Sequence, residues 1–403
     1  MGSMEEKVKD LNAYYRPTRV EISLDAMRRN LEAVKASLPE GCRIMASVKA
    51  NAYGHGAVGI AEAAERFGVD YLGVAFLDEA LQLRRAGIKA PILVLGFVPA
   101  DGLEIARRYG IAISLFRKDI LDAAAALEDA GGLKLKVHIK IDSGMGRLGV
   151  IGVKASLDFI QNALNTPQLE VEGMFTHYAN ADEADKSYTK LQYDRFSEIA
   201  AAVKERGWSI PLIHAANSAG GIDTPEWAGG MVRLGIGLYG LYPSQEVNRS
   251  RVKLEPVLSL KSKVVFVKHA PEGWGISYGT RYFAGKNEII GTLPIGYADG
   301  FSRLLTGKAH ALIDGVKRPI VGTICMDQCM VSLGEAAAGT GAIEAGAEAV
   351  LIGQQGEAII TAEEVAEQLG SIPYELICML AARVPRVYIE NGTVVRVANP
   401  LDF

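Results

Sequence analysis

One repeating pattern constrains the fold of this chain more than any other feature. Short runs of apolar and β-branched residues alternate with stretches of helical periodicity, and these runs cover residues 43–50, 71–76, 91–96, 111–116, 136–142, 171–177, 212–218 and 232–240. Eight strands that alternate with helices over about 200 residues are typical of a (β/α)8 barrel. A doubly wound sheet shares the alternation, but it would be expected to carry a GxGxxG turn after its first strand, where this sequence has none.

One of the helical stretches, residues 187–207, places Tyr188, Leu191, Phe196, Ile199, Ala200 and Val203 at roughly the helical period, and we expect this stripe to face the strands. After about residue 250 the character changes to strands separated by Gly, Asp-Gly and Asn-Gly turns. One further helix follows Thr361, which is a candidate N-cap.

The sequence therefore predicts three parts. Residues 1–18 are an N-terminal extension that begins with a tag remnant, and residues 19–250 form the (β/α)8 barrel of TIM type. Residues 251–403 form a mostly β C-terminal domain, with which a strand at 19–23 could pair.

Composition excludes several functional classes. The net charge of −4 does not favour binding to nucleic acid or to an anionic membrane. No apolar run approaches the ~20 residues that cross a bilayer. The N-terminus has no signal-peptide pattern, so we expect a cytoplasmic protein. The four cysteines lack CxxC spacing and the six histidines form no HExxH motif, which predicts buried reduced thiols and no metal site.

The residues that end the predicted barrel strands point to a cofactor. Lys49 ends the first strand, residues 217–221 (NSAGG) end the seventh, and the eighth contains Arg233 and Gly235. Active sites of such barrels lie at these strand ends, and phosphate often binds after the seventh and eighth strands. A lysine together with a phosphate cradle describes pyridoxal phosphate held as a Schiff base.

Three side chains at the same end have competing interpretations. Arg233 could face the pyridine nitrogen of the cofactor, or it could be a salt-bridged strand arginine. Arg147 could bind a substrate carboxylate, or it could be a loop residue facing solvent. His177 could be functional or structural.

These residues, in this order, resemble the alanine racemase family of fold-type III pyridoxal-phosphate enzymes over nearly the whole chain. The motifs that carry the resemblance are VKANAYGHG, MGRLG, AANSAG, RLGIGLYG, SYG, PIGYADG and CMDQ. The resemblance implies that L-alanine and D-alanine are interconverted, which would supply D-alanine for cell-wall peptidoglycan. It also implies a head-to-tail homodimer, in which the second domain of each subunit reaches the barrel of its partner.

The resemblance also implies individual roles. Lys49, which would bind the cofactor covalently, and Tyr278, reaching in from the partner subunit, would be the two catalytic bases. Other cofactor contacts would come from Tyr53, His177, Asn217, Ser218, Arg233, Gly235, Ile236 and Tyr297. Arg147 and the backbone of Met326 would bind the substrate, and Lys140 matches a lysine often carbamylated in the family.

One departure keeps other functions open. The family commonly has a tyrosine just before RVPR, where this chain has Ala382, and Tyr374 matches a different family position. We expect weaker cofactor retention or a roomier pocket, so a broader serine/alanine racemase remains an alternative. A decarboxylase is disfavoured by Arg233, and a non-enzymatic carrier of pyridoxal phosphate is disfavoured by the second domain and by Tyr278.

Overall fold

The computed structural model describes residues 14–335 and 343–401, so residues 1–13 of the predicted N-terminal extension, with the tag remnant, lie outside the described part. The chain divides into two compact units. The barrel unit comprises 26–52 and 60–255, and the second unit comprises the residues before 26, the segment Tyr53–Gly59 and the residues from Pro256 onward.

The predicted barrel strands are confirmed. All neighbouring strands in the eight-stranded sheet run parallel, in the order β8-β7-β6-β5-β4-β3-β2-β9. The strands are β2 (Arg43–Ser47), β3 (Tyr71–Val74), β4 (Ile92–Val94), β5 (Ile111–Leu115), β6 (Leu135–Lys140), β7 (Leu169–Phe175), β8 (Leu212–His214) and β9 (Met231–Leu234). Each strand ends earlier than its predicted run, because the backbone turns away there, and β7 begins two residues earlier than predicted.

Between β8 and β9 the barrel is closed by individual backbone hydrogen bonds and an isolated bridge. Gly230 N–H donates to the carbonyl of Ile213 (2.7 Å), and Arg233 N–H donates to the carbonyl of Ala216 (3.0 Å). Part of the barrel interior is filled by one apolar cluster from six strands: Met45, Tyr71, Leu93, Ala112, Leu212 and Met231.

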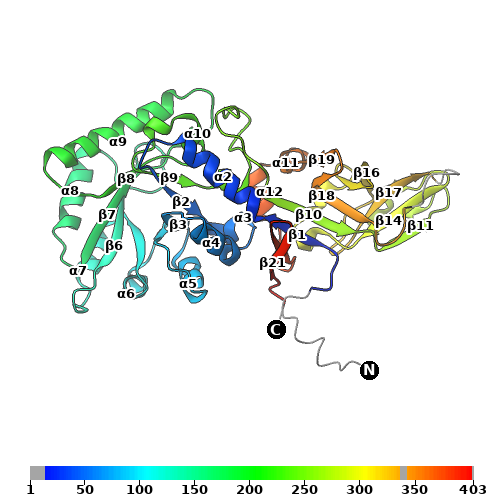
Figure 1. Cartoon of the computed structure of the whole chain (residues 1–403), viewed down its shortest axis with the longest axis horizontal. Helices are drawn as coiled ribbons and strands as arrows, with labels where there is room; N and C mark the ends of the chain where they lie inside the picture. The colour runs from blue at the N-terminus through cyan, green and yellow to red at the C-terminus, as the bar shows by residue number, and fades with distance from the viewer. Residues whose placement is uncertain (1–13, 336–342, 402–403) are drawn as a thin grey trace. The chain divides into compact units, whose positions relative to one another are not determined.

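Helices surround these strands (Figure 1). They are α2 (Leu24–Ser37), α4 (Ala57–Arg66), α5 (Leu77–Arg85), α6 (Leu103–Arg108), α7 (Lys118–Ala125), α8 (Val153–Leu164), α9 (Ser187–Glu205) and the short α10 (Ser218–Asp223). In α9 the apolar stripe is only partly as predicted. Phe196, Ile199 and Val203 are buried, but Tyr188 and Leu191 are exposed, because the N-terminal half of the helix packs against polar loops rather than strands.

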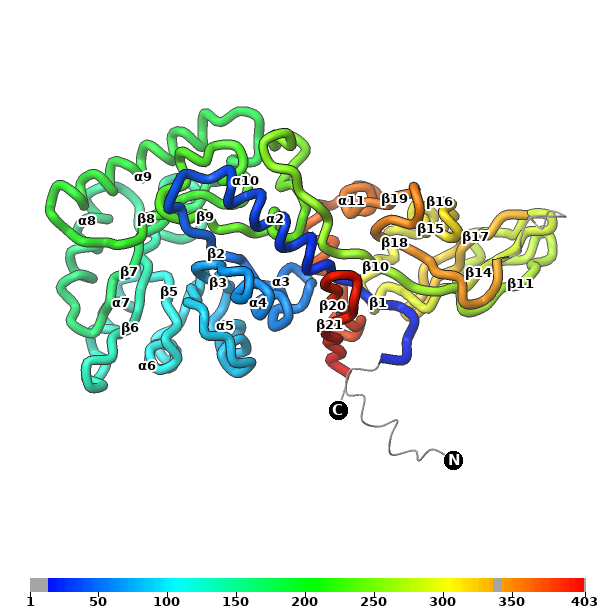
Figure 2. The backbone as a smooth tube through the Cα atoms, viewed as in Figure 1, coloured from blue at the N-terminus to red at the C-terminus, as the bar shows by residue number. Residues whose placement is uncertain are grey.

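The second unit is mostly β, as predicted. Its main sheet has eleven strands, with β1 (Arg19–Ser23) antiparallel to β10 (Leu258–Lys263) and parallel to β20 (Arg386–Glu390). In Figure 2, β1, drawn in blue, lies beside β20, which pairs in turn with β21 (Thr393–Ala398), both drawn in red.

The other strands of the main sheet are β11 (Phe266–His269), β14 (Glu288–Leu293), β15 (His310–Ile313), β16 (Val316–Val321), β17 (Cys329–Glu335), β18 (Glu348–Gln355) and β19 (Ala358–Ile360). β12 (Gly275–Ile276) and β13 (Tyr282–Phe283) form a separate two-stranded sheet. Two predicted hairpin turns are confirmed, since Asp314 and Asn391 have φ of 52° and 51° and each is followed by a left-handed glycine. Thr361 caps α11 (Ala362–Leu369) as expected, and α12 covers Pro373–Cys378.

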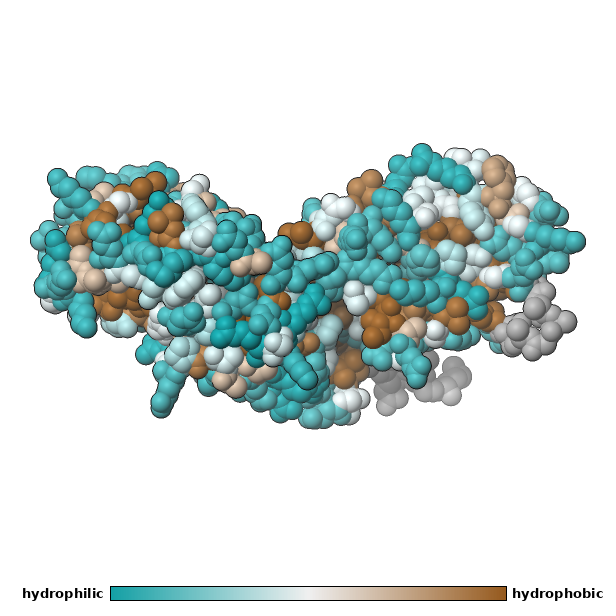
Figure 3. Space-filling view, turned by 90° about the horizontal axis from the view of Figure 1, so that it is seen from above, coloured by the Kyte–Doolittle hydropathy of each residue, from teal (hydrophilic) through white to brown (hydrophobic). Residues whose placement is uncertain are grey.

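Charged and polar residues with scattered apolar ones cover the face drawn in Figure 3. Within the described ranges no helix has the length and apolar character needed to cross a membrane. None of the four cysteines forms a disulfide, but only Cys329 is buried. The expectation of buried thiols is therefore wrong for the other three, and Cys378 is exposed at the end of α12.

Candidate active site

Lys49 does not end a strand, as the sequence suggested, but begins a left-handed turn. β2 stops at Ser47, and the next element, α3 (Lys49–Tyr53), has φ between 51° and 54° at each of its last four residues. Each non-glycine residue in this conformation costs about 1–2 kcal/mol. The turn is anchored within the barrel unit, because the N–H of Ala50 donates to a carboxylate oxygen of Glu79 (2.7 Å).

Backbone strain of this kind is concentrated at two places. Of the nine described non-glycine residues with positive φ, three are the loop residues Asn287, Asp314 and Asn391. The other six lie beside the two predicted catalytic bases: 50–53 after Lys49, and Ser277 and Thr280 around Tyr278. Because strained backbone clusters at functional sites, these two segments are the strongest site candidates in the fold.

Arg233 is held rigidly inside the barrel. Its Nη2 donates to the carbonyls of Thr176 and Ala215 (both 2.7 Å) and lies 3.1 Å from Nδ1 of His177. Its Nη1 lies 2.9 Å from Nδ1 of His214. Burial lowers the pKa of Arg233 to about 10, so the guanidinium remains charged at neutral pH. The salt-bridged interpretation is wrong, because these partners are carbonyls and imidazoles.

Four cationic side chains share this end of the barrel: Lys49, Lys140, Arg147 and Arg233. Burial, followed by repulsion from Arg233, Arg147 and Lys49, lowers the pKa of Lys140 to about 7. Its Nζ lies 3.4 Å from the carbonyl of Leu95 and 5.1 Å from the centre of the Phe175 ring. The site is therefore suited to anions, and near pH 7 a substantial part of Lys140 is the neutral amine.

The two histidines beside Arg233 are neutral. Burial, with the positive charge of Arg233, lowers the pKa of both His177 and His214 well below the usual range. Since a guanidinium only donates hydrogen bonds, Nδ1 of each ring accepts from Arg233 and Nε2 carries the proton.

The predicted phosphate cradle is assembled around Ser218. Its Oγ accepts hydrogen bonds from the N–H groups of Gly235 (2.8 Å) and Gly237 (3.3 Å), so the starts of α10 and of the 3-10 turn at Ile236–Tyr239 meet there. Asn217 caps α10 by accepting from the N–H of Gly220 (3.0 Å). Helix starts present backbone N–H groups that favour anions.

Gly237 is closely packed next to this cradle. A Cβ on Gly237 would lie 3.1 Å from a terminal methyl of Leu234, which would have to shift by a few tenths of an ångström, and at an ordinary contact distance of 3.5 Å from Oγ of Ser218.

Arg147 is exposed on the loop after β6, and α9 anchors that loop. Arg195 Nη1 donates to the carbonyl of Ser143 (3.1 Å), and the hydroxyl of Tyr188 donates to that of Gly144 (2.7 Å). Gln192, buried between them, donates to the carbonyl of His177 (3.0 Å).

Sequence reasoning missed these three helical residues. Tyr188, Gln192 and Arg195 stand at positions i, i+4 and i+7 of α9, so a polar stripe at helical spacing was the available signal. They connect the Arg147 loop with the segment that carries His177.

On the second unit, Tyr278 is 72% exposed at the tip of a strained loop. Thr323 ties this loop down from both sides, because its hydroxyl donates to the carbonyl of Tyr278 (2.7 Å) and its carbonyl accepts from the hydroxyl of Ser277. A cavity of about 310 Å³ beside it is lined by Lys268, Trp274, Gly275, Ile276, Ser277, Tyr278, Cys325 and Met330.

Tyr297 and Met326 lie on adjoining loops of the same unit. The N–H of Tyr297 donates to the carbonyl of Cys325 and that of Ala298 to the carbonyl of Met326 (both 3.0 Å). Asp299, a buried carboxylate that sequence reasoning missed, fixes the first loop by ion pairs with Arg16 and Arg383 (both 2.8 Å).

Ala382 and Tyr53 also belong to the second unit. Ala382 is exposed in a turn. Tyr53 is buried with its ring centre 6.2 Å from that of Tyr374, and burial raises the pKa of its phenol. The predicted site residues thus fall into a barrel group and a second-unit group that includes Tyr53, Tyr278, Tyr297 and Met326.

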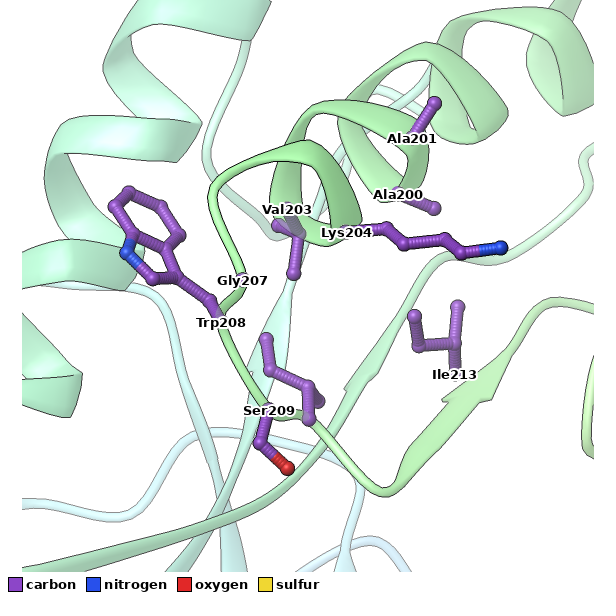
Figure 4. Close-up of a pocket in the computed structure, with 9 residues that line it drawn as sticks. Ala200, Ala201, Val203, Lys204, Gly207, Trp208, Ser209 and Ile213 are labelled. Atoms are coloured by element: carbon purple, nitrogen blue, oxygen red, sulfur yellow. The ribbon is translucent and has the colours of Figure 1, made fainter.

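A larger cavity of about 600 Å³ lies elsewhere on the barrel unit. Figure 4 shows Val203 and Lys204 of α9 facing Ile213 of β8 across it. Apart from Lys204 and Ser209 its lining is apolar, so it lacks the convergent polar groups of the strand-end site.

Comparison with known proteins agrees with this geometry. The family described as alanine racemase, N-terminal domain, matches residues 22–243, and alanine racemase, C-terminal domain, matches 257–388. An alanine racemase of Clostridium tetani is 43% identical over 387 residues, 96% of this chain and 99% of that protein.

Solved structures give the same result. The crystal structure of alanine racemase from Bacillus anthracis with bound L-Ala-P has a TM-score of 0.90 and 44% identity, covering 96% of this chain and 99% of that one. A histidine racemase from Leuconostoc mesenteroides has a TM-score of 0.84 and 32% identity, covering 94% of this chain and 100% of its own. The chain therefore belongs to the alanine racemase family, whose members are isomerases.

Proposed function

We propose that this protein is a pyridoxal-phosphate-dependent racemase that interconverts L-alanine and D-alanine with two bases. The environment of Arg233 carries the proposal. A carboxylate at the pyridine nitrogen would keep that nitrogen protonated and the ring strongly electron-withdrawing, whereas a donor-only guanidinium leaves it neutral. Weaker electron withdrawal favours return of the Cα proton over loss of the carboxylate.

The barrel residues fit this cofactor. Lys49 would hold its aldehyde carbon, and Ser218, Gly235 and Ile236 would hold its phosphate where two helix starts meet. Further contacts would come from Tyr53, His177, Asn217, Arg233 and Tyr297. When bound, the cofactor draws electrons from the amino acid and makes its Cα proton acidic.

Inversion at Cα requires one base on each face, and we assign these roles to Lys49 and Tyr278. A free phenol has a pKa of about 10, so Tyr278 needs a partner that stabilises its anion. His177 is suited to this role, because its Nδ1 accepts from Arg233 and its Nε2–H is left as a donor.

Tyr278 would act in the site of a second copy of the chain. Trp274, Phe283 and Met326 are exposed apolar residues on the same unit, a feature typical of a surface that becomes covered. A head-to-tail homodimer would bring Tyr278 and Met326 of one subunit to the barrel of its partner. A single chain should then be inactive.

Substrate binding would depend on Arg147, whose guanidinium can engage a carboxylate with two hydrogen bonds. The pKa of about 7 for Lys140 supports carbamylation, since only a neutral amine reacts with carbon dioxide. The resulting carbamate anion would offset the neighbouring cations and hold Arg147 in position.

A broader amino-acid racemase is the second candidate. Ala382 leaves less bulk than a tyrosine would at that position, and a histidine racemase has the same fold. Serine is the first substrate to compare with alanine.

Mixing two inactive variants tests the proposal most sharply. In a dimer of one Lys49→Ala chain and one Tyr278→Phe chain, one site contains both changes and the other contains neither. Equal mixtures should therefore recover about a quarter of the wild-type racemase activity. A Tyr109→Phe chain, altered at an exposed barrel tyrosine, is the control and should remain active alone.

Recovery would support both the two bases and the shared site. Full activity of Tyr278→Phe alone would refute its role as a base, and loss of activity that mixing does not restore would refute sharing between subunits. We further propose that the enzyme works in the cytoplasm and supplies D-alanine for peptidoglycan. It should then restore growth of bacteria that require added D-alanine.

A further inference from the structure

A polar column continues from Arg233 into the interior of the barrel. Nη1 of Arg233 on β9 lies 2.9 Å from Nδ1 of His214 on β8, and Nε2 of His214 lies 3.0 Å from Nδ1 of His138 on β6. Nε2 of His138 then lies 3.9 Å from Oε2 of Glu172 on β7. We call Arg233, His214, His138 and Glu172 the barrel column.

The hydrogen-bond chain has a single consistent direction. Arg233 only donates, so Nδ1 of His214 accepts and its Nε2 carries the proton. That proton is donated to Nδ1 of His138, which leaves the proton of His138 on Nε2. The column therefore ends on a buried donor that faces the carboxylate of Glu172, about 1 Å beyond an ordinary N–H···O distance.

Each member of the column is in the charge state that this direction requires. Burial lowers the pKa of His138 and His214, so both rings are neutral at neutral pH. Burial alone would raise the pKa of Glu172, but His138 and Lys136 outweigh it, and the pKa is lowered. Glu172 is thus an anion, bonded also by the ammonium of Lys136 and contacted by the hydroxyl of Tyr71 at 3.5 Å.

Phe175 packs against two members of the column, His214 and Arg233. The Phe175 ring lies parallel to that of His214, with centres 5.0 Å apart, and Arg233 lies 5.3 Å from the centre of Phe175. A change in the tautomer of His214 would place two donors, Arg233 Nη1–H and His214 Nδ1–H, against each other. The guanidinium would then have to move.

We propose that Glu172 is a positioning residue for the reaction, acting through His138 and His214 to hold Arg233 in the orientation that the cofactor meets. This inference rests on the proposed function for its consequence in catalysis. The negative end of the column favours the same tautomers of His138 and His214 that the donor-only guanidinium requires, so both ends hold the hydrogen-bond chain in one direction. The Nη1–H of Arg233 therefore keeps an unprotonated acceptor, Nδ1 of His214.

The test compares Glu172→Gln with Glu170→Gln, which removes the same charge from an exposed position on the same strand. The chain has six histidines, so ¹⁵N-histidine labelling gives few signals. In the wild type, His138 and His214 should each show one protonated Nε2 and one unprotonated Nδ1. Glu172→Gln should give mixed tautomers at His138, and Glu170→Gln should not.

Two further readouts link the column to the site. With pyridoxal phosphate bound, Glu172→Gln should shift the pH midpoint of the cofactor absorption band. It should also lower kcat for alanine about tenfold with little change in KM. Glu172→Asp, which keeps the carboxylate, should restore much of both.

Identical histidine signals and band midpoints in the two glutamine variants would overturn the proposal. So would mixed tautomers of His138 in the unaltered protein, a measurement that does not depend on any variant folding. If Glu172→Gln changes the tautomers of His138 but the wild type does not invert alanine, the proposed function is wrong and the tautomer selection by Glu172 stands. If the wild type inverts alanine and Glu172→Gln leaves the tautomers unchanged, only the role proposed for Glu172 is wrong.

Discussion

Replacing Lys140 by methionine should remove a pH-dependent penalty from the folded barrel. The pKa of this lysine falls from 10.5 to about 7, and the side chain is 5% exposed. Between these two values the unfolded chain binds more protons than the folded one, so stability rises with pH. The slope is about 1.4 kcal/mol per pH unit, which gives roughly 2 kcal/mol between pH 7.5 and 9.

The wild type should therefore gain about 2 kcal/mol of unfolding free energy relative to Lys140→Met over this pH range. Denaturant unfolding of the cofactor-free chain in buffer without carbon dioxide measures the difference. In a Trp274→Phe background, fluorescence comes only from Trp208 and Trp227, which report on the barrel unit. Lys134→Met, just before β6 and exposed, is the control and should follow the wild type.

Parallel pH profiles of the wild type and Lys140→Met would refute the reasoning, because they would show that Lys140 keeps an ordinary pKa in the folded state. Adding bicarbonate provides a second comparison. Carbamylation turns the neutral amine of Lys140 into an anion beside Arg147 and Arg233, so bicarbonate should stabilise the wild type and leave Lys140→Met unchanged.

Three other predictions follow from the site. Ala50→Gly should leave the free energy of unfolding in denaturant unchanged or raise it by up to about 1 kcal/mol, because glycine relieves the left-handed turn. The control Ala201→Gly in α9 should lower it by about 1 kcal/mol. Equal losses in the two variants would show that the backbone at Ala50 is not strained. Ser218→Ala should speed cofactor dissociation severalfold, measured by dialysis and absorbance, and unchanged retention would count against the phosphate cradle. Ala382→Tyr should raise the preference for alanine over serine in kcat/KM, and no change would remove Ala382 as a determinant.

Much of the fold could be predicted from sequence, because strand-forming runs and turn chemistry are local properties. The eight barrel strands, the cap at Thr361 and the turns at 314–315 and 391–392 all follow from short patterns. The ends of the strands did not follow. Residues 48–50 read as a continued strand, but the left-handed turn after Lys49 is imposed by the surrounding structure, since local preference opposes it.

The site was predictable where a motif places chemistry at a strand end, as at Lys49, Ser218 and Arg233. Supporting residues were not, because their role depends on which elements meet in space. Gln192 looks like an ordinary surface residue in sequence, and Asp299 stands out only as part of the PIGYADG motif, yet each is buried and fixes a loop that carries a predicted site residue. The barrel column could not be predicted for the same reason, because its four members lie on four different strands.

The measurement that most directly tests the central claim is proton NMR with chiral analysis of L-alanine incubated with the cofactor-loaded protein in D₂O. The proposed two-base racemase predicts loss of the α-proton signal together with the appearance of D-alanine that carries solvent deuterium. Bound cofactor with neither exchange nor inversion of alanine would contradict the assignment.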